Sequence, residues 1–311
     1  MSMSYERILG DLAERDERIV VMTAENRAAI RGLPARLGSR FIDTGITEMT
    51  LVGMATGLAL RGRIPVVHAL AAFLTLRAYE FIRTDIGITG VPVKLVGYVP
   101  GILSEANGPT HQAIEDLALM RAIPGLRVFC PADGPELVAG LPHIVADPHP
   151  WYIRYVDAAA RLPHTGEFAI GRAEVHGDDG GTPPDVSLVA CGYTAGEAHG
   201  AAEILRQDGL RVHVVNLRTL VPVDESALLE AARADLVVTV EDHRRVGGLH
   251  SRLCELLVAR GLRANVRAVA IEDWFTPALL ADAIVHAGLD AGSIAARTRA
   301  WLSQLEVDHV R

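Results

Sequence analysis

The stretch FIDTGITEMTLVGMATGLAL, residues 41–60, joins a short apolar strand pattern to a helical pattern that is almost free of charge. Gly45 follows the strand, and Glu48 is the only acid of the helix. We expect that helix over residues 47–60, because a threonine hydroxyl followed by an acid suits a helix start. Small residues would let the helix approach another backbone closely; they are Gly53, Ala55, Gly57 and Ala59. The stretch therefore predicts a strand–turn–helix unit with one carboxyl group at the head of the helix.

The same alternation of strand and helix patterns continues along the chain. In the first half, apolar strand patterns begin at Ile19, Arg40, Pro65, Val93, Arg127 and Trp151, with helical patterns at 74–86, 114–122 and 134–145. In the second half, the strand patterns are VSLVACG, VHVVNL, DLVVTVED and VRAVAI, again separated by helical patterns. Unbroken apolar strands with crossover helices predict parallel sheets covered on both faces, which is an α/β fold.

The length and one polar segment predict two domains. The chain has 311 residues, and domains commonly have roughly 100–200. The turn-rich string HGDDGGTPPD interrupts the alternation. We therefore expect a first domain at 1–165, a linker at 166–185 and a second, smaller domain at 186–311.

Composition excludes several classes of protein. The formal net charge is −8 and the chain has no block of Lys and Arg, so we expect no nucleic-acid partner. The N-terminus lacks the apolar core of a signal peptide, and the apolar runs stop short of the roughly 20 residues that span a bilayer. The three cysteines are scattered, which favours buried free thiols in a reducing compartment. These features predict a cytoplasmic protein.

A second stretch, SEANGPTHQAIEDLALMRAIP at 104–124, combines a Gly-Pro turn with polar side chains. The turn would deliver Thr110, His111 and Gln112 to the front of a helix that has acids in its first turn. From the residues alone, His111 is either catalytic or bonded to nearby backbone. Glu48 is likewise either a functional acid or one that only stabilises a helix dipole.

Three motifs together resemble the transketolase family. Residues 41–60 are similar to that family's G-I-A-E-Q segment followed by a small-residue helix. GPTHQAIEDLALMRAIPGLRVFCPAD, at 108–133, resembles its G-x-T-H-Q-x-I-E-D signature in order and spacing. VEDHRRVGGLHSRLCELL, at 240–257, resembles E-E-H-x-x-x-G-G-L-G-S in its C-terminal domain. The resemblance runs in register over about 19–270, and it implies a pyrimidine-binding domain followed by a transketolase C-terminal domain.

The resemblance implies a role for the acid and for its apolar neighbours. In the family, the acid at the position of Glu48 donates to N1′ of the aminopyrimidine of thiamine diphosphate and so activates this cofactor. Phe73 stands where family members stack an aromatic ring on the aminopyrimidine, although it would also suit an ordinary core. Leu70 and Leu76 replace aromatic residues that often flank it. Together with Ile46, they imply an aliphatic cofactor pocket.

Three further residues are implied to face the substrate. His111 would assist proton transfers on substrate oxygens. Asn107 stands where the family has an aspartate that bonds a donor hydroxyl, and an amide can still donate and accept there. Arg154 aligns with an arginine that contacts the phosphate of sugar phosphates. Arg154 would equally suit an ion pair with a neighbouring carboxylate.

Two other phosphate contacts of the family are missing. A family histidine upstream of His111 is replaced by Val99, and a serine near the first strand falls at about Ala29. Arg27 lies close enough in sequence to take over part of that role. We therefore expect an unusual substrate, such as a modified sugar without a terminal phosphate.

The resemblance also implies a partner chain. In the family, the diphosphate and its Mg²⁺ or other divalent ion are held by a separate domain with G-D-G and a later Asn. The only similar string here, Gly177 to Gly180, lies in the expected linker, and no Asn follows before Asn216. We therefore predict no metal site in this chain and an obligate N-terminal-half subunit that holds the diphosphate. An α2β2 assembly is expected, with Glu48 and Phe73 at an apolar subunit interface.

Three alternatives remain open. The chain resembles, less closely, the β subunit of a 2-oxo acid dehydrogenase E1. RAYEFIRTDI, at 77–86, has some similarity to deoxyxylulose-phosphate synthase. A non-catalytic scaffold subunit with the same fold is the third. Against these, the expected activity is transfer of a two-carbon ketol unit between a ketose and an aldose.

Overall fold

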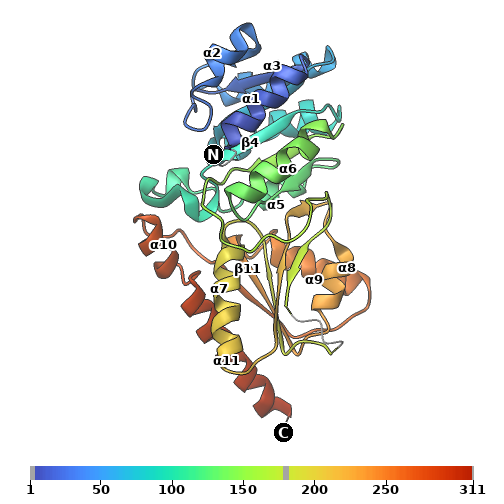
Figure 1. The fold of residues 1–311 in the computed structure, drawn as a ribbon, viewed down its shortest axis with the longest axis vertical. Coiled ribbons are helices and arrows are strands. Elements are labelled where there is room, and N and C mark those ends of the chain that lie inside the picture. Colours follow the sequence, from blue (N-terminus) through green and yellow to red (C-terminus); the bar gives the residue numbers. More distant parts are fainter. Residues whose placement is uncertain (1–3, 178–181, 310–311) are drawn as a thin grey trace.

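The computed structural model describes residues 4–177 and 182–309, which form two α/β domains stacked along the long axis (Figure 1). The first domain contains a seven-stranded sheet of order β10-β5-β6-β4-β3-β1-β2. Six of these strands come from the first half of the chain and run parallel: β1 Ile19–Thr23, β2 Phe41–Asp43, β3 Ile64–Leu70, β4 Lys94–Tyr98, β5 Arg127–Phe129 and β6 Trp151–Arg154. The expected parallel sheet is therefore confirmed.

Helices cover both faces of this sheet. The α-helices are α1 Tyr5–Arg15, α2 Leu33–Leu37, α3 Glu48–Leu60, α4 Tyr79–Phe81, α5 Asp116–Arg121 and α6 Gly134–Ala146. The 3₁₀ segments are η1 Gly38–Arg40, η4 Gly101–Asn107 and η5 Pro109–His111, and the π-helical segments are η2 Phe73–Arg77 and η3 Ile82–Gly87. The helix expected at 74–86 is thus interrupted, with two π-helical segments flanking the short α4.

The helix expected from Thr47 begins one residue later. Glu48 is the first residue of α3, and Thr47 does not cap it, because the Thr47 hydroxyl donates to the carbonyl of Thr44 at 3.0 Å. Leu51, Val52 and Ala55 of α3 are buried in the core. This packing fixes α3 against the sheet and with it the position of Glu48.

The second domain has a five-stranded sheet of order β12-β11-β8-β9-β7. The strands of this half are β7 Glu174–His176, β8 Val186–Ala190, β9 Val212–Asn216, β10 Thr219–Val221, β11 Leu236–Arg244 and β12 Val266–Ile271. The helices are α7 Thr194–Gln207, α8 Glu225–Ala231, α9 Leu249–Ala259, α10 Leu280–His286 and α11 Ala291–His309. Helices α7 and α11 cover one face, and α8 and α9 cover the other (Figure 1).

The two halves are joined more closely than a simple linker requires. Strand β7 lies inside the expected linker 166–185, yet it pairs antiparallel with β9 of the second sheet. Strand β10 comes from the second half of the chain, yet it pairs antiparallel with β5 of the first sheet. One core cluster contains Leu95 and Leu117 of the first domain together with Val215 and Leu253 of the second. The boundary between the domains is therefore a continuous packed interface.

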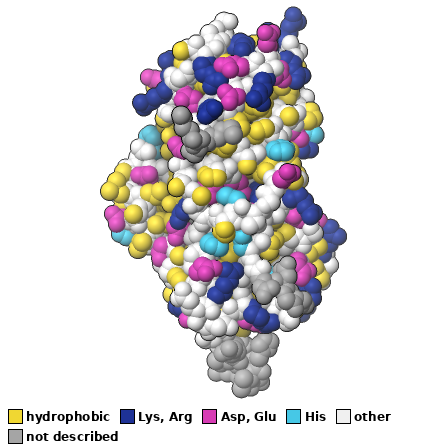
Figure 2. Space-filling model, in the orientation of Figure 1, with side chains coloured by type: hydrophobic (Ala, Val, Ile, Leu, Met, Phe, Trp, Pro, Cys, Tyr) yellow, Lys and Arg dark blue, Asp and Glu magenta, His cyan; other side chains and the backbone are white. Residues whose placement is uncertain are grey.

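The charged side chains and the cysteines agree with two expectations from the sequence, mixed surface charge without a basic block and buried free thiols. Lys and Arg side chains lie among Asp and Glu side chains on the face shown in Figure 2. Cys130 and Cys191 are buried and Cys254 is partly buried, all three as free thiols. Among the described residues, no helix has the length and apolar character needed to cross a membrane.

Candidate functional site

Glu48 lies at the head of α3, just after the turn that follows β2. Gly45 has φ of +69°, a conformation that an L side chain rarely adopts, and it allows this turn. Glu48 is only 2 % exposed. Its Oε2 accepts a hydrogen bond of 2.8 Å from Nη1 of Arg77. A buried carboxylate at a helix head is thus present, as expected, and it is paired with a cation that the sequence did not single out.

Phe73, Arg77 and His111 continue the row that begins at Glu48. The Arg77 guanidinium carbon lies 4.6 Å from the centroid of the Phe73 ring. The Phe73 ring meets the His111 imidazole edge-on, with centroids 5.0 Å apart. We call these four residues the Glu48–His111 row. Three of them were predicted site residues, and the fold brings them together from three separate segments.

Arg77 is the member that sequence reasoning missed. It lies four residues after Phe73, a spacing that places two side chains on the same face of a helical turn. That spacing was the available signal. The interrupted π-helical geometry at Phe73–Arg77 also marks the segment, because π-helical turns are frequent at functional sites.

The segment that carries His111 is held by local contacts and by one hydrogen bond to the second domain. Pro109–His111 form a 3₁₀ turn after Gly108, and the Thr110 hydroxyl lies 2.9 Å from Nδ1 of His111. The amide of Gln112 donates to the carbonyl of Phe275 at 2.7 Å. Asn107 is exposed, and its amide donates to the carbonyl of Ser104 at 2.8 Å. The expected contact between Asn107 and a substrate remains a prediction.

The motif at 240–257 supports this segment from the other domain. Glu241 is buried, which raises its pKa to about 8, and its carboxyl oxygens accept from two backbone N–H groups at the start of α9. The N–H of Ala118 in α5 donates to Nε2 of His243 at 3.1 Å. Gly247 has φ of +84°, and a Cβ there would lie 2.4 Å from that of Ala118. Gly247 thus permits close contact between α5 and the second domain.

Arg154 is held between two carboxylates, which is the second of its two alternatives. It is 3 % exposed. Its Nε donates to Oδ2 of Asp116 at 2.9 Å, and its Nη1 donates to Oδ1 of Asp242 at 2.6 Å. Asp116 begins α5 of the first domain and Asp242 lies in β11 of the second. In this structure, Arg154 joins the two domains and is not open to a substrate phosphate.

The aliphatic residues predicted for the cofactor pocket lie partly at the surface. Ile46 is 66 % exposed and Leu76 is 44 % exposed, whereas Leu70 is partly buried. On α3, Met49 and Met54 are also exposed. We call Ile46, Met49, Met54 and Leu76 the apolar rim. These exposed side chains flank Glu48 and Phe73 in the sequence and belong to the segments that carry them.

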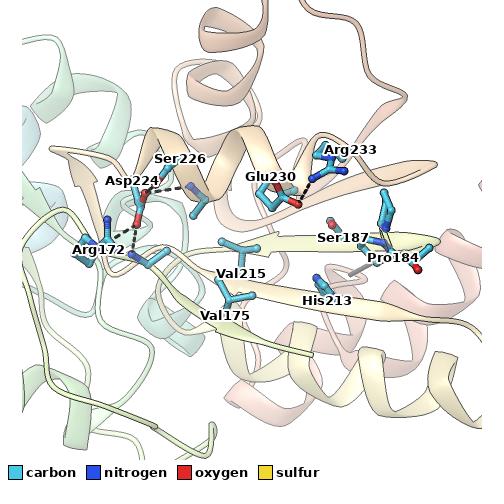
Figure 3. Close-up of a pocket in the computed structure, with 15 residues that line it drawn as sticks. Arg172, Val175, Pro184, Ser187, His213, Val215, Asp224, Ser226, Glu230 and Arg233 are labelled. Atoms are coloured by element: carbon cyan, nitrogen blue, oxygen red, sulfur yellow. Dashed lines mark hydrogen bonds and ion pairs between the residues drawn. The ribbon is translucent and has the colours of Figure 1, made fainter. Parts of the chain in front are cut away.

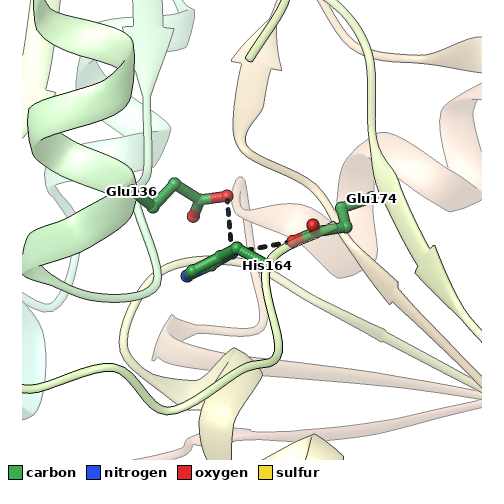
Figure 4. A group of neighbouring side chains, drawn as sticks. All are labelled: Glu136, His164 and Glu174. Carbon is green, nitrogen blue, oxygen red and sulfur yellow. Dashed lines mark hydrogen bonds and ion pairs between the residues drawn. The ribbon is translucent and has the colours of Figure 1, made fainter. Parts of the chain in front are cut away.

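One cluster in the described residues has the composition of a metal site (Figure 4). Ligand atoms of Glu136, His164 and Glu174 lie within 4.8 Å of one another. Arg218, however, already lies 2.9 Å from a carboxylate oxygen of each of the two glutamates. Hydrogen bonds to Asp133 and Glu174 raise the pKa of His164 to about 10. Both glutamates are therefore already paired with an internal cation, and the cluster is an ion-pair network between the domains.

A cavity of about 580 Å³ lies in the second domain, away from the predicted site residues (Figure 3). It is bounded by α8 and by the strands that carry Val175 and Val215. Ion pairs lie along it, Arg172 with Asp224 and Arg233 with Glu230. None of the expected cofactor or substrate residues lines this cavity, so the Glu48–His111 row remains the candidate site.

The fold and the row define an α/β protein of two sheet domains with a buried acid beside an aromatic ring. Two family models match the chain: the transketolase pyrimidine binding domain over residues 1–161 and the transketolase C-terminal domain over residues 178–294. The chain belongs to the transketolase family.

Relatives of two kinds are similar to the chain. The 6-deoxy-6-sulfo-D-fructose transketolase subunit SqwH of Clostridium sp. (strain MSTE9) is 36 % identical, over 90 % of this chain and 87 % of that protein. The 1-deoxy-D-xylulose-5-phosphate synthase of Thermomicrobium roseum is also 36 % identical, over 96 % of this chain but only 48 % of its own length.

A solved structure described as a split gene transketolase, inactive beta4 tetramer, superposes with a TM-score of 0.86 at 32 % identity. It covers 96 % of this chain, and 97 % of its own chain is matched.

Replacing Arg154 by methionine should destabilise the chain by about 3–5 kcal/mol, because Asp116 and Asp242 would be left buried without a cation. Urea unfolding of the two proteins measures this. The control is Arg245→Met, which breaks the exposed pair between Arg245 and Glu272 and should cost less than about 1 kcal/mol. Equal losses of unfolding free energy in the two variants would show that the buried ion pairs of Arg154 stabilise the chain no more than an exposed ion pair does.

The His164 cluster predicts a pH dependence of stability. His164 has a pKa of about 10 in the folded chain, above its ordinary value of about 6.5, so the folded state holds the proton more tightly. This contribution is complete below about pH 6.5 and is lost as pH rises through about 10. Between pH 7 and 10 the thermal midpoint of the wild type should fall more steeply than that of His164→Gln. If the thermal midpoints of the two proteins fall in parallel as pH rises, the charge of His164 does not stabilise the folded chain.

Proposed function

We propose that this chain is a subunit of a thiamine-diphosphate-dependent, transketolase-like transferase that moves a two-carbon ketol unit from a ketose to an aldose. The observation that carries the proposal is the Glu48–His111 row. It combines a buried carboxylate at a helix head, an aromatic face and an imidazole. Membership of the transketolase family supports this assignment of roles.

The residues of the row fit the pyrimidine half of the cofactor. Glu48 offers a carboxyl group on a buried, apolar helix, and Phe73 offers a ring face that a planar group can stack on. The guanidinium of Arg77, a flat group, already lies against Phe73 and donates to Glu48, which supports this fit. When bound, thiamine diphosphate supplies the electron sink for cleavage of a carbon–carbon bond.

Each side chain would then have a separate task. Glu48 would hold a proton at N1′ of the aminopyrimidine, and Phe73 would fix the plane of that ring. His111, in edge-on contact with Phe73, would move protons on substrate oxygens. The neighbouring apolar side chains would exclude water, which strengthens the hydrogen bond at Glu48.

The diphosphate and its divalent ion would be held by a second chain, an N-terminal-half subunit. Within the described residues, the glutamates of the one cluster with metal-ligand composition are already paired with Arg218 and His164. Of the G-D-G-like string, residues 178–180 lie outside the described part of the chain. The names of two relatives support a divided enzyme, since one is a transketolase subunit and the other a split gene transketolase. An α2β2 assembly would place the apolar rim at a subunit interface.

The substrate would be a ketose whose far end does not rely on the phosphate contact that Arg154 makes in the family. Arg154 is engaged by Asp116 and Asp242. Arg27, the other candidate, donates to Asp43 at 2.7 Å. The SqwH relative is named for 6-deoxy-6-sulfo-D-fructose, a sugar with a sulfo group at its sixth carbon. A modified ketose without a terminal phosphate fits these observations.

A second function has one specific observation in its favour. The deoxyxylulose-phosphate synthase of T. roseum matches 96 % of this chain at 36 % identity. An enzyme of that type would condense pyruvate with an aldehyde and release carbon dioxide. Supplying the assembled complex with ketose donors and, separately, with pyruvate distinguishes the two, because only the second reaction evolves carbon dioxide.

Replacing Glu48 by glutamine should lower turnover of the assembled complex at least about a hundredfold, because an amide cannot hold the proton at N1′. Ketol transfer is measured after mixing with the partner chain. Glu230→Gln, a change at an exposed pair in the second domain, is the matched control and should leave turnover unchanged. Full activity of Glu48→Gln would favour a scaffold role.

Introducing a charge in the apolar rim should weaken assembly. Met54→Glu places a carboxylate in a surface that we propose to be buried by another subunit, and it should raise the dissociation constant at least about tenfold. Val258→Glu is the control, since Val258 is an exposed apolar residue on α9 of the other domain. Analytical ultracentrifugation of the mixed chains reports the constant, and unaltered assembly by Met54→Glu would exclude the rim from the interface.

A further inference from the structure

The planar guanidinium of Arg77 makes two contacts, one with Glu48 and one with Phe73. One edge of its guanidinium donates to Glu48 at 2.8 Å, while its carbon lies 4.6 Å from the centroid of the Phe73 ring. Among the residues that the structure describes, these are the polar and ring contacts of Arg77. The guanidinium therefore occupies the space where the face of Phe73 and the carboxylate of Glu48 can be reached together.

The same two contacts are required of an aminopyrimidine in the proposed site. A ring stacked on Phe73 would place its centroid about 4.5–7 Å from that of the phenylalanine, and its N1′ would accept a hydrogen bond from the carboxyl group of Glu48. A guanidinium is likewise flat and delocalised, with N–H groups at its edge that match a carboxylate. Both groups need the same face of Phe73 and the same carboxyl group of Glu48, so both cannot be present at once.

We propose that Arg77 is an internal stand-in for the aminopyrimidine, which fills the pyrimidine half-site of the chain until thiamine diphosphate displaces it. The inference rests on the proposed function and adds a competition within that site. When the cofactor binds, its aminopyrimidine ring replaces the Arg77 guanidinium over Phe73, and the Arg77 side chain moves outward.

The surroundings of Arg77 suit such an exchange. Its side chain is 43 % exposed, whereas that of Glu48 is 3 % exposed. Arg77 can therefore swing into solvent without crossing packed protein, while Glu48 stays fixed by α3. Without cofactor, a buried carboxylate at Glu48 would lack a partner, and such a charge is costly. Arg77 supplies that partner in the free subunit.

The test is the affinity of the assembled complex for thiamine diphosphate with Mg²⁺, measured by calorimetry without substrate. Arg77→Met removes the competitor and should tighten binding about tenfold, the combined weight expected for a partly exposed ion pair and a cation–π contact. Arg77→Lys keeps the charge but not the planar stack and should fall between. Arg233→Met, at an exposed pair of the second domain, should match the wild type.

A second measurement uses the isolated chain with 4-amino-2-methylpyrimidine, the ring of the cofactor alone. Arg77→Met should bind this probe more tightly than the wild type, and the double variant with Glu48→Gln should lose the gain. Cofactor affinity that is unchanged or weakened by Arg77→Met overturns the inference.

The two hypotheses fail in different ways. If Glu48→Gln abolishes turnover while Arg77→Met leaves cofactor affinity unaltered, only the proposal that Arg77 occupies the aminopyrimidine position is wrong. If Glu48→Gln leaves turnover and cofactor affinity intact, the proposed function fails and the stand-in fails with it.

Discussion

The bridge that Arg154 makes between Asp116 and Asp242 is the interaction on which the rest of the structure depends. It is buried and joins β6 and α5 of the first domain to β11 of the second. Asp116 opens the helix that follows the His111 turn, so the position of His111 relative to Phe73 is set partly by the second domain. Breaking such a bridge leaves uncompensated charge in the interior. The C-terminal domain is thereby a structural part of the site although it contributes no member of the Glu48–His111 row.

The strands and most helices could be predicted because apolar periodicity reports burial directly. The pairing of β7 and β10 could not, since Glu174–His176 and Thr219–Val221 are three-residue segments whose partners lie far away in sequence. Glu48, Phe73 and His111 were found through motifs with fixed spacing. Arg77 was missed because its four-residue spacing from Phe73 is the only local signal, and most exposed arginines on helical segments have an equally spaced neighbour. The partners of Arg154 depend on tertiary packing that no local signal contains.

The proposed site would be one half of a catalytic centre. Its acid and its aromatic ring are fixed by packed elements, while the apolar rim, which belongs to the same segments of the chain, is exposed. Exposed apolar side chains on the segments that carry a buried carboxylate would suit a surface that another subunit covers. The relatives named as transketolase subunits and as a split gene transketolase agree with this division. The cavity of the second domain, by contrast, is bounded by ion pairs and is separate from the row.

The crossing of β10 has a consequence for how this fold could be divided in evolution or by engineering. A fragment that stopped at the end of the first domain would lose the strand that covers β5, and an uncovered edge is a template for pairing with other molecules. The complementary fragment would carry β10 without β5, the strand with which it pairs. A cut between the two domains would therefore leave in each fragment a strand that lacks this partner, so the two domains are not independent folding units.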